Sequence, residues 1–260
     1  MVKISSLFTK FRLFNTVDYA AVDYESASNI IIGEAEQQNS YGVFALPVHG
    51  LVTAIQDPVM QEATQQVQMI VPDGQPIRWA MNYFHQAGLK DRVYGPTLTL
   101  YVLGKANQKR LNVFLYGGNT QETLNKFAGF IRENYPNLTV CGKYREEYPD
   151  SNTLSSKTIN NSGAHIVLVG RGCPRQEVWV ANRLGKVNAV MMAVGAAFSF
   201  HAGTIKQAPS WMQKAGLEWL FRLLMEPQRL WKRYFLTNGY FIYLFLKEMI
   251  IPNHRERTIS

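Results

Sequence analysis

A single aspartate stands where a predicted strand gives way to a predicted helix. The apolar run 69–71 is followed by Pro72-Asp73-Gly74, and apolar residues at helical spacing begin at Ile77. In an open α/β sheet, ligands bind in the crevice at the carboxyl ends of the strands. Asp73 is therefore a candidate functional carboxylate. The alternative is that Asp73 only caps the helix, since Asp accepts hydrogen bonds from the first free N–H groups of a helix.

Two glycine-containing turns have the position of a phosphate-binding loop. Gly117-Gly118 and Gly170-x-Gly172 each follow an apolar run and precede a helical pattern. The free N–H groups at the start of such a helix attract an anion. Neither turn has the spacing of the dinucleotide fingerprint or of a P-loop. Each can equally be an ordinary turn, because glycine is common wherever a chain bends.

The segments around these residues alternate between short apolar runs and helical patterns. Such alternation predicts an α/β fold with a mostly parallel sheet that is covered by helices on both faces. We expect strands at about residues 14–22, 43–46, 69–71, 111–116, 138–142, 165–169 and 189–194, and helices at about 23–38, 49–67, 77–84, 120–134, 151–160 and 174–184, with a break at Pro58.

Length and composition exclude several classes of protein. The chain has 260 residues, of which 47% are hydrophobic and 18% charged, so it can bury a core and is not a disordered protein. Cys141 and Cys173 have no metal-ligand spacing and are too few for a disulfide scaffold, which fits a reducing compartment. The basic N-terminal segment has no long apolar region, so it is not expected to be a signal peptide. The uncharged stretch 234–246 has 13 residues, whereas a membrane-spanning helix needs about 20.

The C-terminal quarter of the chain is basic and aromatic. The net charge is +8, and residues 204–260 carry nine Lys or Arg against four Glu. This asymmetry predicts a polyanionic partner, namely nucleic acid, an acidic membrane or a phosphorylated substrate. Arg222, Arg229 and Arg233 are spaced by seven and four, so they would share one stripe on nearly collinear helices. The segment suits an amphipathic element on an anionic bilayer, or a core-packing helix pair with a solvated basic side. A nucleic-acid binder is a weaker candidate, because stacking requires aromatic residues that face solvent.

Five sequence blocks resemble one known family. They read PDGQPIRWA (72–80), RVYGP (92–96), LVGRGCPRQEVW (168–179), GAAFSFHAG (195–203) and APSWMQKAGLEWLFRLLMEPQRLWKRY (208–234). Together they resemble the WecG/TagA/CpsF family of bacterial cell-envelope glycosyltransferases, over residues of about 14 to 250. The resemblance implies a Rossmann-like α/β catalytic domain, residues 1–203, that binds a UDP-sugar. It also implies a C-terminal amphipathic helical appendage, residues 204–260, that docks on the inner face of the cell membrane.

The resemblance also implies an activity. Members move a sugar from a UDP-sugar to a polyprenyl-diphosphate-linked saccharide, with inversion and without a metal, in the synthesis of exopolysaccharide, capsule or teichoic-acid-type polymers. The expected donor is a hexosyl or N-acetylhexosaminyl unit, and no cofactor and no metal site are expected. We expect a cytoplasmic protein that is peripheral on the membrane and binds no nucleic acid; a homo-oligomer is left open. The alternative is a basic membrane-associated module that binds a nucleotide-sugar without turnover.

Individual residues take roles from the resemblance. Asp73 falls on the proposed catalytic base of the family, and Gln176 and Glu177 fall on a pair that contacts the nucleotide-sugar. Arg222 and Arg229 fall on arginines thought to reach the diphosphate of the acceptor. The full set of candidate residues is Asp73 for catalysis, Gly74, Gly117, Gly118, Gly170, Gln176, Glu177 and His49 for the nucleotide-sugar, and Arg222, Arg229, Arg233 and Lys232 for the acceptor diphosphate.

The chain departs from the family pattern at two places. Where many members have Thr-x-Asn near the first crevice strand, the sequence reads Ala45-Leu46-Pro47, followed by Val48-His49. His49 is either a substitute polar contact or a core histidine. The common Phe-Asp-Phe block reads Phe198-Ser199-Phe200, so one carboxylate is missing and Asp73 is favoured as the base. We therefore expect part of the sugar pocket to be built differently.

Overall fold

The structure, a computed structural model, describes residues 7–145, 154–251 and 258–259. Within these ranges, the side chains of six residues lie outside the description: Ser210, Lys214, Arg229, Arg233, Thr258 and Ile259.

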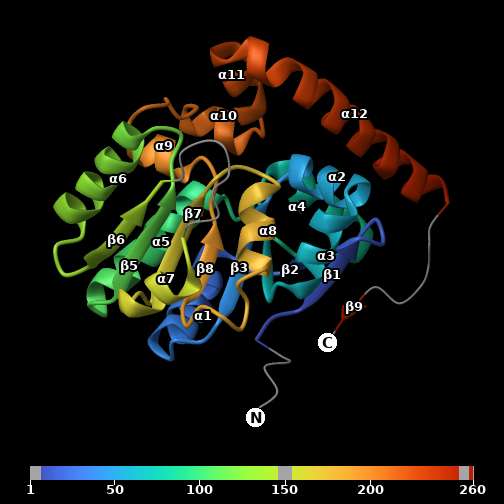
Figure 1. Ribbon diagram of the computed structural model, residues 1–260. Helices are drawn as coiled ribbons and strands as arrows, with labels where there is room; N and C mark the ends of the chain where they lie inside the picture. Colours follow the sequence, from blue (N-terminus) through green and yellow to red (C-terminus); the bar gives the residue numbers. More distant parts are fainter. Residues whose placement is uncertain (1–6, 146–153, 252–257, 260) are drawn as a thin grey trace.

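A six-stranded, wholly parallel sheet forms the centre of the molecule (Figure 1). Its strands occur in the order β4-β3-β8-β7-β5-β6. All but the edge strand β6 are almost fully buried, as expected for a parallel sheet that is covered on both faces. The bounds are β3 Tyr41–Leu46, β4 Met69–Pro72, β5 Asn112–Gly117, β6 Thr139–Tyr144, β7 Ile166–Gly170 and β8 Val190–Ala193.

Helices cover both faces of this sheet, which confirms the predicted α/β class. Successive residues of a strand point to opposite faces, so Phe44 belongs to one hydrophobic core and Val43 to the other. One face carries α1 Tyr24–Glu36, α5 Gly95–Gln108, α6 Gln121–Asn134 and α9 Ala197–His201. The other carries α2 Val48–Gln56, α3 Pro58–Gln66, α4 Gln75–His85, α7 Ser156–Asn161 and α8 Arg175–Ala181.

Local sequence signals set several helix starts. Asp23 and Ser26 form a reciprocal capping box at the start of α1, the helix expected at about 23–38. Asp57 accepts hydrogen bonds from two N–H groups of α3, and Pro58 is the first residue of that helix. The helical pattern over 49–67 is therefore divided into α2 and α3, with the break at the expected proline.

Two expectations about individual elements were wrong. The single strand expected over 14–22 is an antiparallel hairpin, with strands β1 Lys10–Leu13 and β2 Val17–Ala20. Phe14 and Asn15 have φ angles of 48° and 54°, so the chain reverses there. In addition, α5 was not predicted, because its opening Gly95-Pro96 has the composition of a turn. The helix expected over 151–160 is α7, and residues 151–153 lie outside the described ranges.

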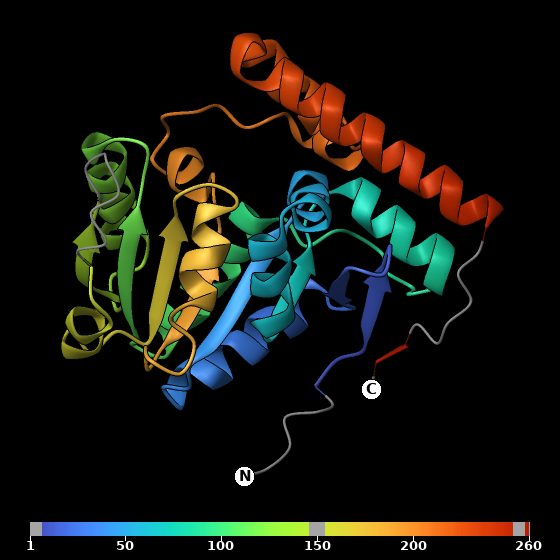
Figure 2. The same ribbon diagram turned by 45° about the vertical axis from the view of Figure 1, so that its right-hand side comes forward.

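Three helices follow the sheet: α10 Ser210–Lys214, α11 Glu218–Met225 and α12 Pro227–Ile250. The long helix α12 runs across α2 and α4 (Figure 2). Its inner face is held by aromatic contacts, in which Phe241 meets Phe14 and Phe245 meets Phe84 and Tyr83. Among the helices of the described ranges, none combines the length and the apolar character needed to cross a bilayer. The division into domains at residue 203 stays a prediction.

The close pairing of β5 and β7 at Gly117 and Gly170 gives a test of the fold. Gly117 has φ +117°, and a Cβ at this residue would lie 2.4 Å from the carbonyl oxygen of Gly170. We expect Gly117→Ala to lower the free energy of unfolding by more than about 2 kcal/mol, because backbone strain adds to a clash with backbone. Chemical denaturation measures the change. Gly129→Ala is the matched control: Gly129 lies within α6 with open space around it, so we expect a gain of about 0.5–1 kcal/mol. Equal effects of the two substitutions would contradict the described turn.

Candidate active site

Asp73 lies where the ends of three neighbouring strands meet. It directly follows β4, and its Oδ2 accepts a hydrogen bond of 3.2 Å from the N–H of Gly95, the first residue of α5. Gly95 packs so closely that an added Cβ would lie 3.0 Å from the Cβ of Ala45 on β3 and 3.6 Å from the carbonyl of Val194, just beyond β8. Asp73 therefore lies at the carboxyl end of a parallel strand, as the sequence predicted.

The capping alternative for Asp73 is wrong for the helix that follows it. Gly74 is the N-cap residue of α4, and no side chain caps that helix. Gly74 has φ +110°, a backbone conformation that glycine adopts without strain. The carboxylate instead faces the N-terminus of α5, which comes from a different part of the chain. A helix N-terminus favours the anionic form of a neighbouring carboxyl group.

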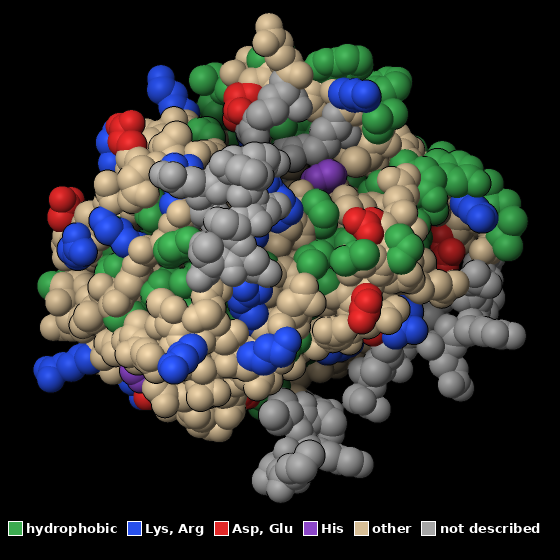
Figure 3. All heavy atoms as spheres, viewed as in Figure 1, with side chains coloured by type: hydrophobic (Ala, Val, Ile, Leu, Met, Phe, Trp, Pro, Cys, Tyr) green, Lys and Arg blue, Asp and Glu red, His purple; other side chains and the backbone are tan. Residues whose placement is uncertain are grey.

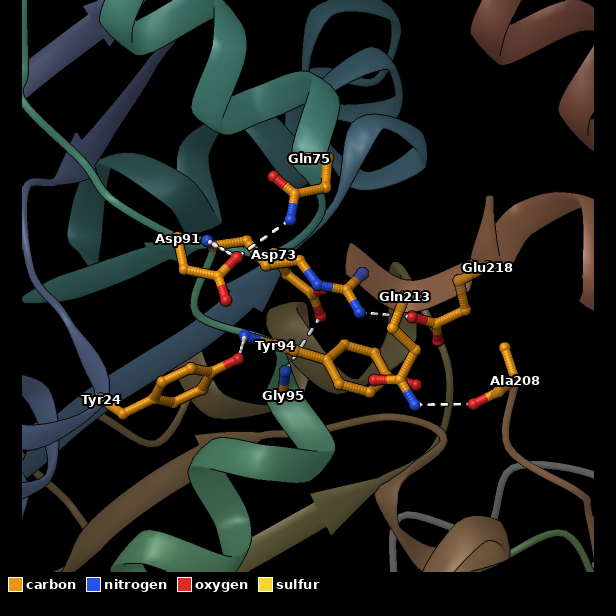
Figure 4. A network of polar contacts seen from close by, with 10 residues as sticks. Tyr24, Asp73, Gln75, Asp91, Tyr94, Gly95, Ala208, Gln213 and Glu218 are labelled. Carbon is orange, nitrogen blue, oxygen red and sulfur yellow. Dashed lines mark hydrogen bonds and ion pairs between the residues drawn. The ribbon is translucent and has the colours of Figure 1, made fainter. Parts of the chain in front are cut away.

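Two arginines and a second carboxylate surround Asp73. Nη2 of Arg92 lies 2.5 Å from Oε2 of Glu218 on α11, and both side chains are less than 10% exposed. The guanidinium of Arg92 also lies 4.3 Å from the centroid of the Tyr94 ring. Arg222, one turn further along α11, lies 5.7 Å from the centroid of the Phe200 ring. Figure 4 shows Asp73, Tyr94 and Gly95 of the core beside Glu218 and Gln213 of the C-terminal helices.

The balance of burial and charge raises the pKa of Asp73 to about 6. Loss of water around the carboxyl group is the largest cause, and the charge of Glu218 acts in the same direction. Arg92, Arg222 and the Gly95 N–H lower the pKa and offset part of this effect. Although the residue Asp73 as a whole is partly exposed, its carboxyl group is surrounded mainly by protein groups. A carboxyl group with such a pKa can exchange a proton near neutral pH.

Of the predicted glycines, Gly117, Gly118 and Gly170 lie together at the ends of β5 and β7, whereas Gly74 follows β4. These neighbouring strands continue to opposite sides of the sheet, β5 to β6 and β7 to β8, so they form its topological switch point. The N–H of Gly118 donates to the carbonyl of Gly170 at 2.9 Å. This donor is therefore used within the protein and does not face a phosphate. Gly170 itself packs against the Phe198 ring, which a Cβ would approach to 2.5 Å.

Gln176 and Glu177 form a buried pair in the first turn of α8. Gln176 accepts a hydrogen bond from the Gly172 N–H at 3.2 Å and donates to Oε1 of Glu177 at 2.8 Å. Its amide therefore has a fixed orientation beside Gly195, the loop that follows β8. Burial raises the pKa of Glu177 to about 7, although the hydrogen bonds from Gln176 and Cys173 lower it. The geometry makes Glu177 a group that orients Gln176.

The remaining predicted residues lie on α2 and on α12. His49 lies in the first turn of α2, directly after β3. Ser199 is buried, and its Oγ accepts a hydrogen bond of 3.4 Å from Nδ2 of Asn119, which follows Gly118. Lys232 is exposed on α12. Arg229 and Arg233 also belong to α12, but their side chains lie outside the described part of the structure.

Sequence reasoning missed the partners of Asp73. Arg92 and Glu218 lie within two of the blocks quoted above, but they are 126 positions apart, so only the fold shows that they pair. Tyr19 and Tyr24 were not singled out either. The Tyr19 hydroxyl donates to the carbonyl of Leu46 at the end of β3, and the Tyr24 hydroxyl accepts from the N–H of Tyr94. The pKa of each is raised by burial first and by the charge of Asp73 to a smaller extent.

The fold and this site define a class of protein: a parallel α/β enzyme with a carboxyl group poised near neutral pH and basic groups beside it. Residues 12–255 match the glycosyl transferase WecG/TagA/CpsF family. The match covers nearly the whole chain, so the protein belongs to this family and is a glycosyltransferase.

Two relatives in Bacillus share much of the sequence. Both are named N-acetylglucosaminyldiphosphoundecaprenol N-acetyl-beta-D-mannosaminyltransferase. The protein of Bacillus subtilis strain 168 is 33% identical over 181 residues, which is 69% of each chain. The protein of Bacillus spizizenii strain W23 is 29% identical over 199 residues, which is 76% of each chain.

The raised pKa of Asp73 predicts that this residue lowers stability at high pH. Its pKa is about 6 in the folded chain and ordinarily 3.8, so folding disfavours the anion and stability falls as pH rises through this window. We expect Asp73→Asn to raise the free energy of unfolding at pH 8 by about 1–3 kcal/mol, and by less at pH 5. Denaturant titrations at both pH values measure this.

Asp18→Asn is the control for this stability test. Asp18 pairs with Arg12 at the protein surface, so its loss is expected to cost between about 0 and 1 kcal/mol. A less stable Asp73→Asn protein at pH 8 would contradict the described environment of Asp73.

Proposed function

We propose that the protein transfers a sugar from a UDP-sugar to a saccharide carried on polyprenyl diphosphate, with inversion and without a metal ion. The observation that carries the proposal is Asp73, a carboxylate directly after β4 that accepts a hydrogen bond from the α5 N-terminus and has a pKa of about 6, which the charges of Arg92 and Arg222 lower. Membership of the family and the names of the two Bacillus relatives support the choice of acceptor. The proposed setting is the synthesis of a cell-envelope polysaccharide.

The groups around Asp73 suit each part of an inverting transfer. Asp73 removes the proton from the acceptor hydroxyl, whose oxygen then attacks the anomeric carbon from the side opposite to UDP. The bond between that carbon and the diphosphate oxygen breaks, and the electron pair leaves with UDP. A positive charge near the departing diphosphate lowers the barrier. Arg222 is the candidate for this role, because guanidinium groups pair well with phosphate oxygens and its charge already acts on Asp73.

The role of Asp73 has a direct test. We expect Asp73→Asn to lower turnover by at least about 100-fold, because an amide cannot accept the proton, while binding of the UDP-sugar stays within a few-fold. The assay measures UDP release with UDP-glucose, UDP-GlcNAc, UDP-ManNAc and uronate donors, on a polyprenyl-diphosphate-linked GlcNAc acceptor. Calorimetry measures donor binding.

The control variant is Asp57→Asn. It makes the same chemical change at the N-cap of α3, where asparagine caps equally well. Turnover of Asp73→Asn at the wild-type rate would remove the proposed base. UDP-sugar binding without release from any donor would instead favour a binding module.

The proposal also includes attachment to the cytoplasmic face of an anionic membrane. Hydrophobic side chains gather along the outer side of α12 (Figure 3). Lys232 and Lys247 are exposed on the same helix. An apolar face beside basic residues is typical of helices that lie in a bilayer interface. The exposed large apolar side chains of α11 and α12 include Leu224, Trp231, Phe235, Ile242, Leu246 and Ile250.

Membrane attachment through α12 predicts a loss of vesicle binding when its apolar face is interrupted. Phe235 is 76% exposed on α12, and Val59 is 57% exposed on α3. We expect Phe235→Ser to weaken binding to vesicles of phosphatidylglycerol and phosphatidylethanolamine several-fold, because the ring no longer leaves water. Val59→Ser should bind as the wild type does. Co-sedimentation measures both, and unchanged binding of Phe235→Ser would favour the reading in which the helix pair serves only packing.

A further inference from the structure

The C-terminal helices are joined to the core by a buried ion pair beside the proposed base. Arg92 and Glu218 are 2.5 Å apart, with side chains 8% and 9% exposed. By contrast, the Arg12–Asp18 and Lys126–Glu122 pairs lie at the surface. When an ion pair is buried, the loss of hydration of both charges offsets much of their mutual attraction. A buried pair is therefore weak evidence for a role in stability alone. Its position beside Asp73 suggests another role.

Glu218 is placed to fix how α11 lies on the core. It is the first residue of α11, where a carboxylate is favoured by the helix dipole. Two residues earlier, Gly216 lies so close to α4 that a Cβ would be 3.2 Å from both Gln75 and Trp79. The chain between α10 and α11 therefore packs against the start of α4. The Arg92–Glu218 ion pair joins the same segment to the core near Asp73.

Arg222 depends on the same contact. It lies four residues after Glu218, so the two side chains share one face of α11. The Arg222 guanidinium lies 5.7 Å from the centroid of the Phe200 ring, and that ring lies 6.4 Å from the ring of Tyr94, so this face of α11 is turned toward the groups around Asp73. If α11 moved away from the core, Arg222 and Glu218 would leave together.

The charges that face Asp73 come from both sides of this contact. The core contributes Arg92 and the N–H of Gly95, and α11 contributes Glu218 and Arg222. Tyr19 and Tyr24 also interact with the charge of Asp73, which raises the pKa of each to a smaller extent than burial does. Without Glu218, the effects of Arg92 and Arg222 on Asp73 would lose the carboxylate charge that offsets them.

We propose that Glu218 is a positioning residue for the transfer reaction: its ion pair with Arg92 holds α11 so that Arg222 faces the crevice, and its charge offsets that of Arg92 beside Asp73. This inference rests on the proposed role of Asp73 as the base. Glu218 has its effect by pairing with Arg92 and by holding α11 in place, and it neither makes nor breaks a bond in the reaction.

Two substitutions separate the two effects of Glu218. Glu218→Gln keeps the shape of the side chain and an acceptor oxygen for Arg92, but it removes the charge. Glu218→Ala also removes the contact and leaves Arg92 buried without its partner. A merely structural residue would change the rate at every pH by the same factor. A charge that acts on Asp73 also moves the pH dependence.

The experiment compares kcat and KM from pH 5 to 9 for the wild type, both Glu218 variants and the control Glu122→Gln, which removes a carboxylate from an exposed pair. Loss of a negative neighbour favours the anionic form of Asp73, so its pKa falls. We therefore expect Glu218→Gln to move the acid limb of the rate profile to lower pH by about 0.5–1 unit. We expect Glu218→Ala to lower kcat/KM by at least about tenfold. Glu122→Gln should match the wild type.

Two further measurements need no turnover. Hydrogen exchange reports whether residues 208–225 stay on the core, and we expect faster exchange in Glu218→Ala but not in Glu218→Gln. Carbon NMR of the Asp73 carboxyl group measures its pKa directly in the wild type and in Glu218→Gln. An unmoved Asp73 pKa in Glu218→Gln, or wild-type exchange in Glu218→Ala, overturns the inference. A wild-type protein that turns over no donor overturns the proposed function instead, and these two measurements still decide what Glu218 does.

Discussion

The site depends on keeping a carboxyl group partly dehydrated at the end of a parallel strand. Burial raises the pKa of Asp73, and the arginines and the α5 N-terminus prevent it from rising further. This balance requires groups from distant parts of the chain: Gly95 of the core and Arg222 of the C-terminal helices. Any change that lets water reach the carboxyl group, or removes one of these charges, changes its proton affinity. The geometry of the crevice and the position of α11 therefore act on the same chemical property.

The close approach of Gly95 to its neighbours helps to hold this geometry. At Gly95, the chain passes between β3, β4 and the residue after β8, and any side chain would press on Ala45 and on Asp73 itself. This close approach brings the start of α5 within hydrogen-bonding distance of the carboxylate. The composition of Gly95-Pro96 is typical of a turn. In the structure, this dipeptide opens α5, whose N-terminus donates a hydrogen bond to Asp73.

The sequence predicted what depends on local pattern and missed what depends on pairing across the chain. The apolar runs identified the strands that end at the crevice, and the Pro-Asp-Gly turn identified Asp73, because a parallel sheet places strand ends together. The helix α5 was missed because Gly95-Pro96 resembles a loop, and its buried face becomes evident only against the sheet. The Arg92–Glu218 contact joins residues 126 positions apart, and no periodicity carries that information. Likewise, the chain reverses at Phe14, so the one expected strand is a hairpin. The ring of Phe14 contacts Phe241 of α12.

The C-terminal helices have two different sides, one that packs on the core near Asp73 and one that exposes apolar side chains. On the inner side, Phe241 and Phe245 pack against core aromatic residues, and Arg222 faces the crevice. On the outer side, α12 exposes a row of large apolar side chains. A polyprenyl chain stays in the bilayer while its diphosphate and sugar reach into water, so an enzyme for such an acceptor needs an apolar surface and a cationic site within a short distance. In this chain, α11 directly precedes α12, so the cationic Arg222 and the exposed apolar side chains of α12 belong to one run of helices.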